Sequence, residues 1–234
     1  MKLNEQLEIE LQAMNLEQYP LVTLREKEFQ KIFSGIFLIN YLSNRAELHR
    51  FFQTDYYQIT FSCIIESYHL LIQNYPRGSL LILRSAIENY FKHLIASVDM
   101  EMYKVHDRVF NANKITLDKI SNQVYVTDIG VLAKAHISRL ESVYGKLSGL
   151  SHSLTAESKS VVRYFSDIKL NNELSLKAIQ EYGKVIDSIV YLLFPLCYQS
   201  FVLWEKNDFE EILDVYLGKK AQKTMLGLVK GVKS

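Results

Sequence analysis

The sequence contains little glycine and proline, with nine glycines and three prolines in 234 residues. Together they make up about half of the roughly 12% that average composition would give. So few turn-forming residues argue against β-sandwiches, β-barrels and glycine-rich phosphate loops. Hydrophobic residues are 48% and charged residues 23% of the chain, as is usual for a folded domain. The composition therefore predicts a helical globular protein.

Cysteine is also scarce. The two cysteines, Cys63 and Cys197, both lie in apolar, helix-like surroundings. Two are too few for a disulfide framework, and the sequence has no Cys-X-X-Cys or Cys/His cluster of the kind that holds zinc. We therefore expect free thiols, no metal and no cofactor.

A secretory signal is not expected, because glutamates interrupt the N-terminal segment MKLNEQLEIELQAMN. The apolar segment at 185–204 has the length of a membrane span, but Asp187 interrupts it and Pro195 should kink it. We interpret this segment as a buried central helix. The sequence thus predicts a cytoplasmic protein without stable membrane insertion.

Apolar residues recur at helical spacing along most of the chain. The pattern predicts an all-α protein, a single antiparallel helical bundle over residues 1–217. Asp55 and Ser79 are the expected N-caps of the third and fourth helices. A short irregular excursion is expected at about 99–128, and residues 148–167 suit either helix or extended structure. The expected helices span about 3–18, 22–52, 55–75, 79–98, 127–147 and 173–206.

The C-terminal segment differs in charge from the rest of the chain. No acidic residue follows Asp214, whereas five lysines do, so the preceding body has a net charge of about −4. We expect residues 218–234 to form a basic, partly apolar tail, either solvated or bound to RNA, an anionic membrane surface or a partner's groove. The candidate ligand-binding residues of this tail are Lys219, Lys220 and Lys223.

Two polar features interrupt the apolar pattern and are candidates for chemistry. Arg84 and Glu88 lie four residues apart on a mostly apolar helix, so their side chains share one face. They suit an ion pair that fixes helix packing, or a ligand-binding or catalytic site. Further along, Tyr144, Ser148 and His152 follow one another at intervals of four and would line one stripe of a helix. This stripe suits a pocket wall or ordinary close packing, helped by the small residues at 145 and 149.

These segments resemble motifs of the HEPN-like class of bacterial helical proteins. The resemblance covers about residues 55–205, with the pattern L-R-x-x-x-E followed by Y-x-x-L-S-x-x-x-H. Its residues in this chain are Leu83, Arg84, Glu88, Tyr144, Leu147, Ser148 and His152. The resemblance implies a bundle that often dimerises and acts in antiphage defence or toxin–antitoxin systems, in some members as a metal-independent ribonuclease.

The nuclease signature of that class, Arg followed by four to six residues and then His, is absent here. Our leading hypothesis is therefore a HEPN-like interaction or accessory protein, a homodimer or bound to a protein partner, with RNA as a further candidate. The first alternative is a divergent ribonuclease, in which Arg84 stabilises a phosphate, His152 transfers the proton and Glu88 orients one of them. The second is a small-ligand-binding bundle that uses the same groove.

Overall fold

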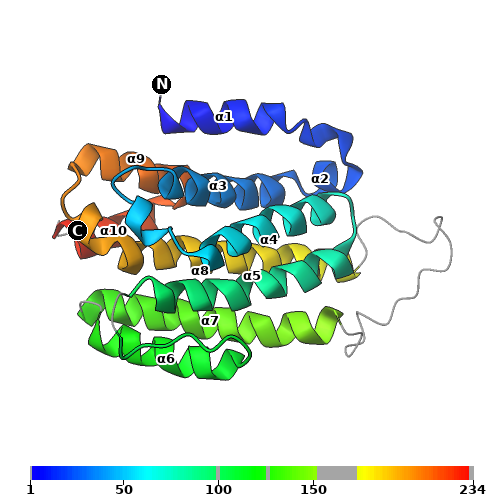
Figure 1. The fold of residues 1–234 in the computed structure, drawn as a ribbon. Helices are drawn as coiled ribbons and strands as arrows, with labels where there is room; N and C mark the ends of the chain where they lie inside the picture. Colours follow the sequence, from blue (N-terminus) through cyan, green and yellow to red (C-terminus); the bar gives the residue numbers. More distant parts are fainter. Residues whose placement is uncertain (1, 99–100, 125–126, 152–172, 232–234) are drawn as a thin grey trace.

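The computed structural model describes residues 2–98, 101–124, 127–151 and 173–231, and all its regular structure there is helical. The predicted all-α bundle is confirmed. Figure 1 shows the helices running side by side, with α1 and α2 over α3 at one side and α6 against α7 at the other. The α-helices are α1 (Leu3–Ala13), α2 (Pro20–Leu24), α3 (Glu26–Ser43), α4 (Asp55–Ile72), α5 (Pro76–Ala96), α6 (Phe110–Gln123), α7 (Thr127–Ser151), α8 (Glu173–Phe201), α9 (Lys206–Tyr216) and α10 (Lys219–Lys230), with 3-10 turns at Leu16–Gln18 and His49–Phe51.

The hairpin of α4 and α5 is closed by a left-handed residue that is not glycine. Asn74 has φ 62°, and the amides of Asn74 and Tyr75 donate to the carbonyls of Leu71 and Leu70 at 3.0 and 2.8 Å. This is the Schellman arrangement that ends many helices. Pro76 then begins α5, where its fixed φ suits the first helical position and its missing N–H costs nothing.

Both predicted N-caps of this hairpin were wrong. Thr54 caps α4, since its hydroxyl accepts the amide of Tyr57 at 3.1 Å, and Asp55 is the first helical residue. Ser79 lies inside α5, where its hydroxyl and carbonyl are 3.1 and 2.8 Å from the buried hydroxyl of Ser67. Ser79 thus joins α5 to α4, and α5 begins at Pro76.

Helix α8 is the centre of the bundle and packs against α3, α4, α5 and α7. Tyr182 is fully buried and donates its hydroxyl to the carbonyl of Ile64 at 2.5 Å. Pro195, which the sequence predicts to kink the central helix, lies inside α8. Among the described residues, no helix is both long and apolar enough to span a bilayer.

The predicted helix at 22–52 is broken into α2, α3 and a 3-10 turn: Arg25 leaves helical geometry with ψ 38° between α2 and α3, and α3 ends at Ser43, before the turn at His49–Phe51. On α3, Gly35 allows close packing: a Cβ there would lie 2.2 Å from Cγ2 of Ile186 on α8. The close approach that the sequence suggested at Gly145 is not found, since a Cβ there would meet nothing within 4 Å.

The predicted irregular excursion at about 99–128 is mostly helical. The segment at 111–114, expected as irregular, forms the first turns of α6. Asn113 is 1% exposed, and its side chain exchanges two hydrogen bonds of 2.8 Å with the backbone of His106. Leu117 and Ile120 are buried below it. The polar character of this segment therefore reflects an asparagine that holds the preceding loop.

Within the C-terminal segment that the sequence separates as a tail from residue 218, the described residues form helix α10. Met225 and Val229 of α10 are buried on the body of the bundle. Lys230 donates its Nζ to the carbonyls of Phe201, Val202 and Trp204, where α8 ends. These apolar contacts explain why a basic segment packs on the body.

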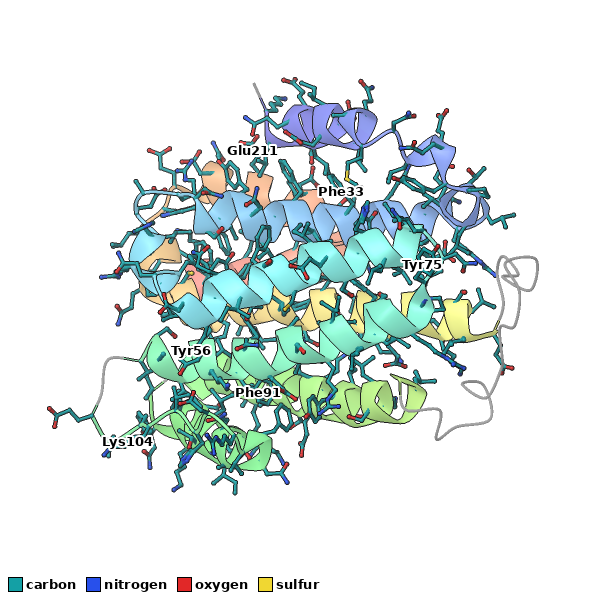
Figure 2. All side chains as sticks on the ribbon, turned by 45° about the vertical axis from the view of Figure 1, so that its right-hand side comes forward. Phe33, Tyr56, Tyr75, Phe91, Lys104 and Glu211 are labelled. Carbon is teal, nitrogen blue, oxygen red and sulfur yellow. The ribbon has the colours of Figure 1, made fainter. Side chains whose placement is uncertain are left out.

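The first and last parts of the chain both attach to α9. The amide of Leu3 donates to Oε1 of Glu211 at 2.6 Å, and Figure 2 places Glu211 below α1. Leu3 and Leu7 are buried beside this bond, while α10 packs on α9 as well. Helix α9 therefore joins two segments that lie more than two hundred residues apart.

Candidate functional site

Arg84, Glu88 and Tyr144 form one hydrogen-bonded group, here called the Arg84 trio. Nη2 of Arg84 donates to the Tyr144 hydroxyl oxygen at 3.0 Å and lies 3.4 Å from Oε1 of Glu88. The Tyr144 hydroxyl in turn donates to the same Glu88 oxygen at 2.5 Å. The side chains of Arg84 and Glu88 are 27% and 35% exposed. The trio ties α5 to α7, and it remains accessible from solvent.

The helical spacing accounts for this meeting. Arg84 and Glu88 are one turn apart on α5, so both point to one side of the helix. Tyr144 lies on α7, which packs against α5. The sequence paired Arg84 with Glu88 and assigned Tyr144 to the stripe of Ser148 and His152; in the structure Tyr144 bonds to the Arg84–Glu88 pair.

A stack of aromatic rings packs against Tyr144 of the trio. Phe91 on α5 stacks on Phe110 of α6 at 5.0 Å between ring centroids, and Phe110 stacks on Tyr144 at 3.9 Å. Figure 2 shows Phe91 on the side of α5 that faces α6 and α7. The guanidinium carbon of Arg84 lies 5.0 Å from the centroid of the Tyr144 ring. Burial and the hydrogen bond to Glu88 raise the pKa of Tyr144, so its hydroxyl stays protonated and acts as a donor.

The trio borders a cavity of about 410 Å³, here called the Arg84 cavity. It lies between α5, α6 and the loop before α6. The residues that line it, besides the trio, are Lys92, His106, Asp107, Arg108, Val109, Phe110 and Asn113. Three permanent cations and two carboxylates thus surround the opening.

The loop residues of the cavity are held in place by contacts to α4 and α5. The carboxylate of Asp107 accepts from the Tyr56 hydroxyl at 2.8 Å and lies 3.9 Å from Nζ of Lys92. Nζ of Lys92 also lies 5.5 Å from the centroid of the Tyr56 ring. Sequence reasoning missed Lys92, His106 and Arg108. The loop that carries His106 and Arg108 has no periodic pattern, and it is positioned by the bonds of Asp107 to α4 and α5 and of Asn113 on α6 to the backbone of His106.

Comparison of the chain with protein-family models, curated proteins and solved structures found no match. The site must therefore be interpreted from its own geometry.

Two other predicted residues of the site are not placed with the trio. Ser148 lies one turn after Tyr144 on α7, and it does not line the Arg84 cavity. His152 lies outside the described residues, directly after the last described residue of α7. Of the predicted site residues that the structure describes, Arg84, Glu88 and Tyr144 alone lie together at the Arg84 cavity.

The predicted lysines of the C-terminal segment lie elsewhere. Lys219, Lys220 and Lys223 are exposed on α10, and the first two line a separate cavity of about 590 Å³ with Leu132 and Tyr191. This cavity shares no residue with the Arg84 cavity. The lysines therefore do not extend the Arg84 site.

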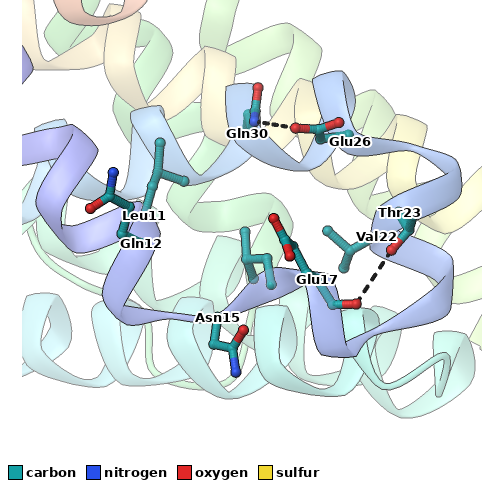
Figure 3. A pocket seen from close by; sticks show the side chains of 9 residues that line it. Leu11, Gln12, Asn15, Glu17, Val22, Thr23, Glu26 and Gln30 are labelled. Carbon is teal, nitrogen blue, oxygen red and sulfur yellow. Dashed lines mark hydrogen bonds between the residues drawn. The ribbon is translucent and has the colours of Figure 1, made fainter.

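A further cavity of about 640 Å³ lies between α1 and the start of α3, and Figure 3 shows the side chains that line it. Its charged residues are Glu17 and Glu26, and Gln30 donates to Glu26 at 2.8 Å. Because it offers carboxylates and amides without a cation, it is unsuited to an anionic ligand.

No group of three potential metal ligands occurs among the described residues. Cys197 is buried and Cys63 is half-buried, and both thiols are free. Burial raises the pKa of both thiols, which opposes thiolate formation and hence nucleophilic chemistry. The chemistry of the described surface is therefore that of cations, carboxylates and hydroxyls.

Proposed function

We propose that this chain is a HEPN-like interaction or accessory protein that binds RNA without cleaving it, in antiphage defence or a toxin–antitoxin system. The observation that supports the proposal is the convergence of Arg84, Lys92 and Arg108 on one solvent-accessible cavity. Phosphate groups are bound by such arginine and lysine sets through charge-assisted hydrogen bonds. Because the body is acidic as a whole, this local set of cations would decide where a polyanion binds.

The hydrogen bonds of the Arg84 trio favour binding over turnover. A ribonuclease needs a proton acceptor beside the attacking hydroxyl and a cation for the developing charge. Here the Tyr144 hydroxyl, protonated and bonded to Glu88, occupies the place beside Arg84. Arg84 and Glu88 are thus engaged with each other, while Arg108 and Lys92 line the same cavity.

One observation favours the ribonuclease as a second candidate. Helix α7 carries Tyr144 to Arg84 and is described as far as residue 151, directly before His152. In the chain, His152 directly follows α7, the helix whose Tyr144 bonds to Arg84. In this candidate His152 would act as general acid or base and Arg84 would stabilise the phosphate.

RNA binding is tested by fluorescence anisotropy with a labelled single-stranded RNA at several salt concentrations. Arg108→Met should weaken binding and reduce the salt slope by about one unit, because one phosphate contact is lost. Lys104→Met is the matched control, since Lys104 lies on the same loop outside the cavity lining and is exposed. Equal losses in both variants, or no RNA binding by the wild type, would contradict the proposal.

Cleavage is tested by incubating the protein with total RNA in the absence of divalent metal. Intact RNA supports a binding protein. Cleavage that disappears in both Arg84→Ala and His152→Ala would instead establish the ribonuclease. Circular dichroism of each variant shows whether the fold is retained.

A further inference from the structure

A second cationic cavity lies away from the Arg84 cavity, and we call it the Lys31 cavity. It has a volume of about 340 Å³ and lies between α3, α7, α8 and α9. Its basic residues come from three different parts of the bundle: Arg25 and Lys31 at α3, Arg139 on α7, and Lys184 on α8. It shares no residue with the Arg84 cavity, so its use does not depend on the function proposed there.

Nearby carboxylates form ion pairs with three of the four cations of this cavity, and Lys31 is the fourth cation. Arg139 pairs with Asp187 at 2.5 Å, and Lys184 pairs with Glu181 at 2.6 Å. Glu28 lies 3.6 Å from Arg25, in a pair whose side chains are 34% and 49% exposed, and such exposed pairs contribute little. Among the described residues, Lys31 has an aromatic contact, with Nζ 5.6 Å from the Tyr216 ring centroid, and no carboxylate within 4 Å. The cavity is therefore electropositive.

Apolar side chains also line this cavity. Ile32 and Ile179 are 3% and 4% exposed and line it together with Leu176 and the Tyr216 ring. Gly183 also lines the cavity, and a Cβ built on it would meet no atom within 4 Å. A cavity lined by cations together with aliphatic and aromatic side chains suits a ligand with an anionic group and a small apolar body.

We infer that the Lys31 cavity binds a small phosphate monoester that carries an apolar or aromatic group. A phosphate monoester has a charge between −1.5 and −2 at neutral pH, and its oxygens match the ammonium donors of Lys31; the guanidinium groups of Arg25 and Arg139, each paired with a carboxylate, line the same cavity. Its apolar group would pack against Tyr216 and Ile179. The volume of about 340 Å³ lies at the small end of the range for ligand sites, which excludes long or branched ligands.

The test is isothermal titration calorimetry of the full chain with phenyl phosphate at low, constant ionic strength. Saturable one-to-one binding is expected, with inorganic phosphate binding more weakly and phenol not binding. Lys31→Met should weaken the binding at least about tenfold, as loss of one charge-assisted hydrogen bond does. Lys27→Met, on the same exposed part of α3 and outside the cavity lining, is the matched control and should change affinity less than about twofold.

A second variant fills the cavity without removing charge. Gly183→Leu should abolish binding, because its side chain would extend into the open space beside Gly183, whereas Gly183→Ala should retain it. Both should melt no lower than the wild type, since replacing a helical glycine favours the helix. Absence of saturable phenyl phosphate binding, or wild-type binding by folded Gly183→Leu, would overturn the inference. Equal affinity for inorganic phosphate would overturn the assignment of an apolar group.

Discussion

Gly35 of α3 and Ile186 of α8 are so close that a Cβ on the glycine would lie 2.2 Å from Cγ2 of the isoleucine. The ring of Tyr216 closes the same space at 2.9 Å. Ile186 is fully buried in the central helix, so it has little room to move. The contact between these two helices therefore depends on the absence of one methyl group.

We expect Gly35→Ala to destabilise the protein by about 1–3 kcal/mol, because overpacking exceeds the gain in helix propensity. Gly145→Ala on α7 is the matched control. Its Cβ would meet nothing within 4 Å, so it should stabilise by up to about 1 kcal/mol. Urea unfolding followed by circular dichroism measures both. Similar effects of the two substitutions would contradict the close packing at Gly35.

Tyr144→Phe should cost about 1 kcal/mol of unfolding free energy. The variant removes the hydroxyl that bridges Arg84 and Glu88 and keeps the ring that stacks on Phe110. Tyr75→Phe is the control, because Tyr75 is 49% exposed. A double-mutant cycle with Glu88→Gln should show coupling between positions 88 and 144. Additive effects would mean that the hydrogen bond contributes nothing.

His93 should make the protein less stable as the pH falls. Its side chain is 0% exposed, and burial lowers its pKa from 6.5 to about 3. The unfolded chain therefore takes up a proton below about pH 6.5 that the folded chain does not accept until about pH 3. Within this window, this residue alone removes up to about 1.4 kcal/mol of stability per pH unit.

The difference between variants isolates this contribution from that of other titrating groups. His93→Asn should have a shallower decline of unfolding free energy between pH 6.5 and 4. His69→Asn is the control, because His69 is exposed on α4 and bonded to Gln73, and it should follow the wild type. A parallel decline in all three proteins would show that His93 is not the cause.

Lys230→Met should destabilise the protein by about 1–2 kcal/mol, since three carbonyls at the end of α8 lose their charged donor. Burial lowers the pKa of this lysine, so the loss should also appear in the wild type at strongly alkaline pH. Lys223→Met, exposed on the same helix, is the control. Hydrogen exchange of α10 amides would show whether the helix stays docked; unchanged protection in Lys230→Met would oppose this role.

Apolar periodicity was sufficient for the helices of the core. The expected segments at 55–75, 79–98 and 173–206 correspond to α4, α5 and α8 within a few residues. It failed at α6, whose buried face includes Asn113 and Ser121 beside two apolar residues. An asparagine in a sequence suggests a loop, and its burial against a backbone can be seen only when the partner segment is placed.

The candidate site was predictable to the extent that it is local. Arg84 and Glu88 are neighbours through helical spacing, so the sequence shows them as a pair. Arg108 reaches the same cavity through a loop that Asn113 and Asp107 hold by non-periodic contacts.

The close helix approach expected at Gly145 occurs instead at Gly35. The tight contact there involves the branched side chain of Ile186 and no second small residue.

The bond between Leu3 and Glu211 bears on how the chain folds as it is made. The residues that it joins are 208 positions apart. At a synthesis rate of about 5–20 residues per second, α1 leaves the ribosome roughly 10–40 s before its partner helix exists. During that interval Leu3 and Leu7, buried in the finished protein, have no surface on α9 to cover them. Helix α1 thus cannot complete its docking until α9 has been made, and until then the side of α1 that faces α9 is open to chaperones and proteases.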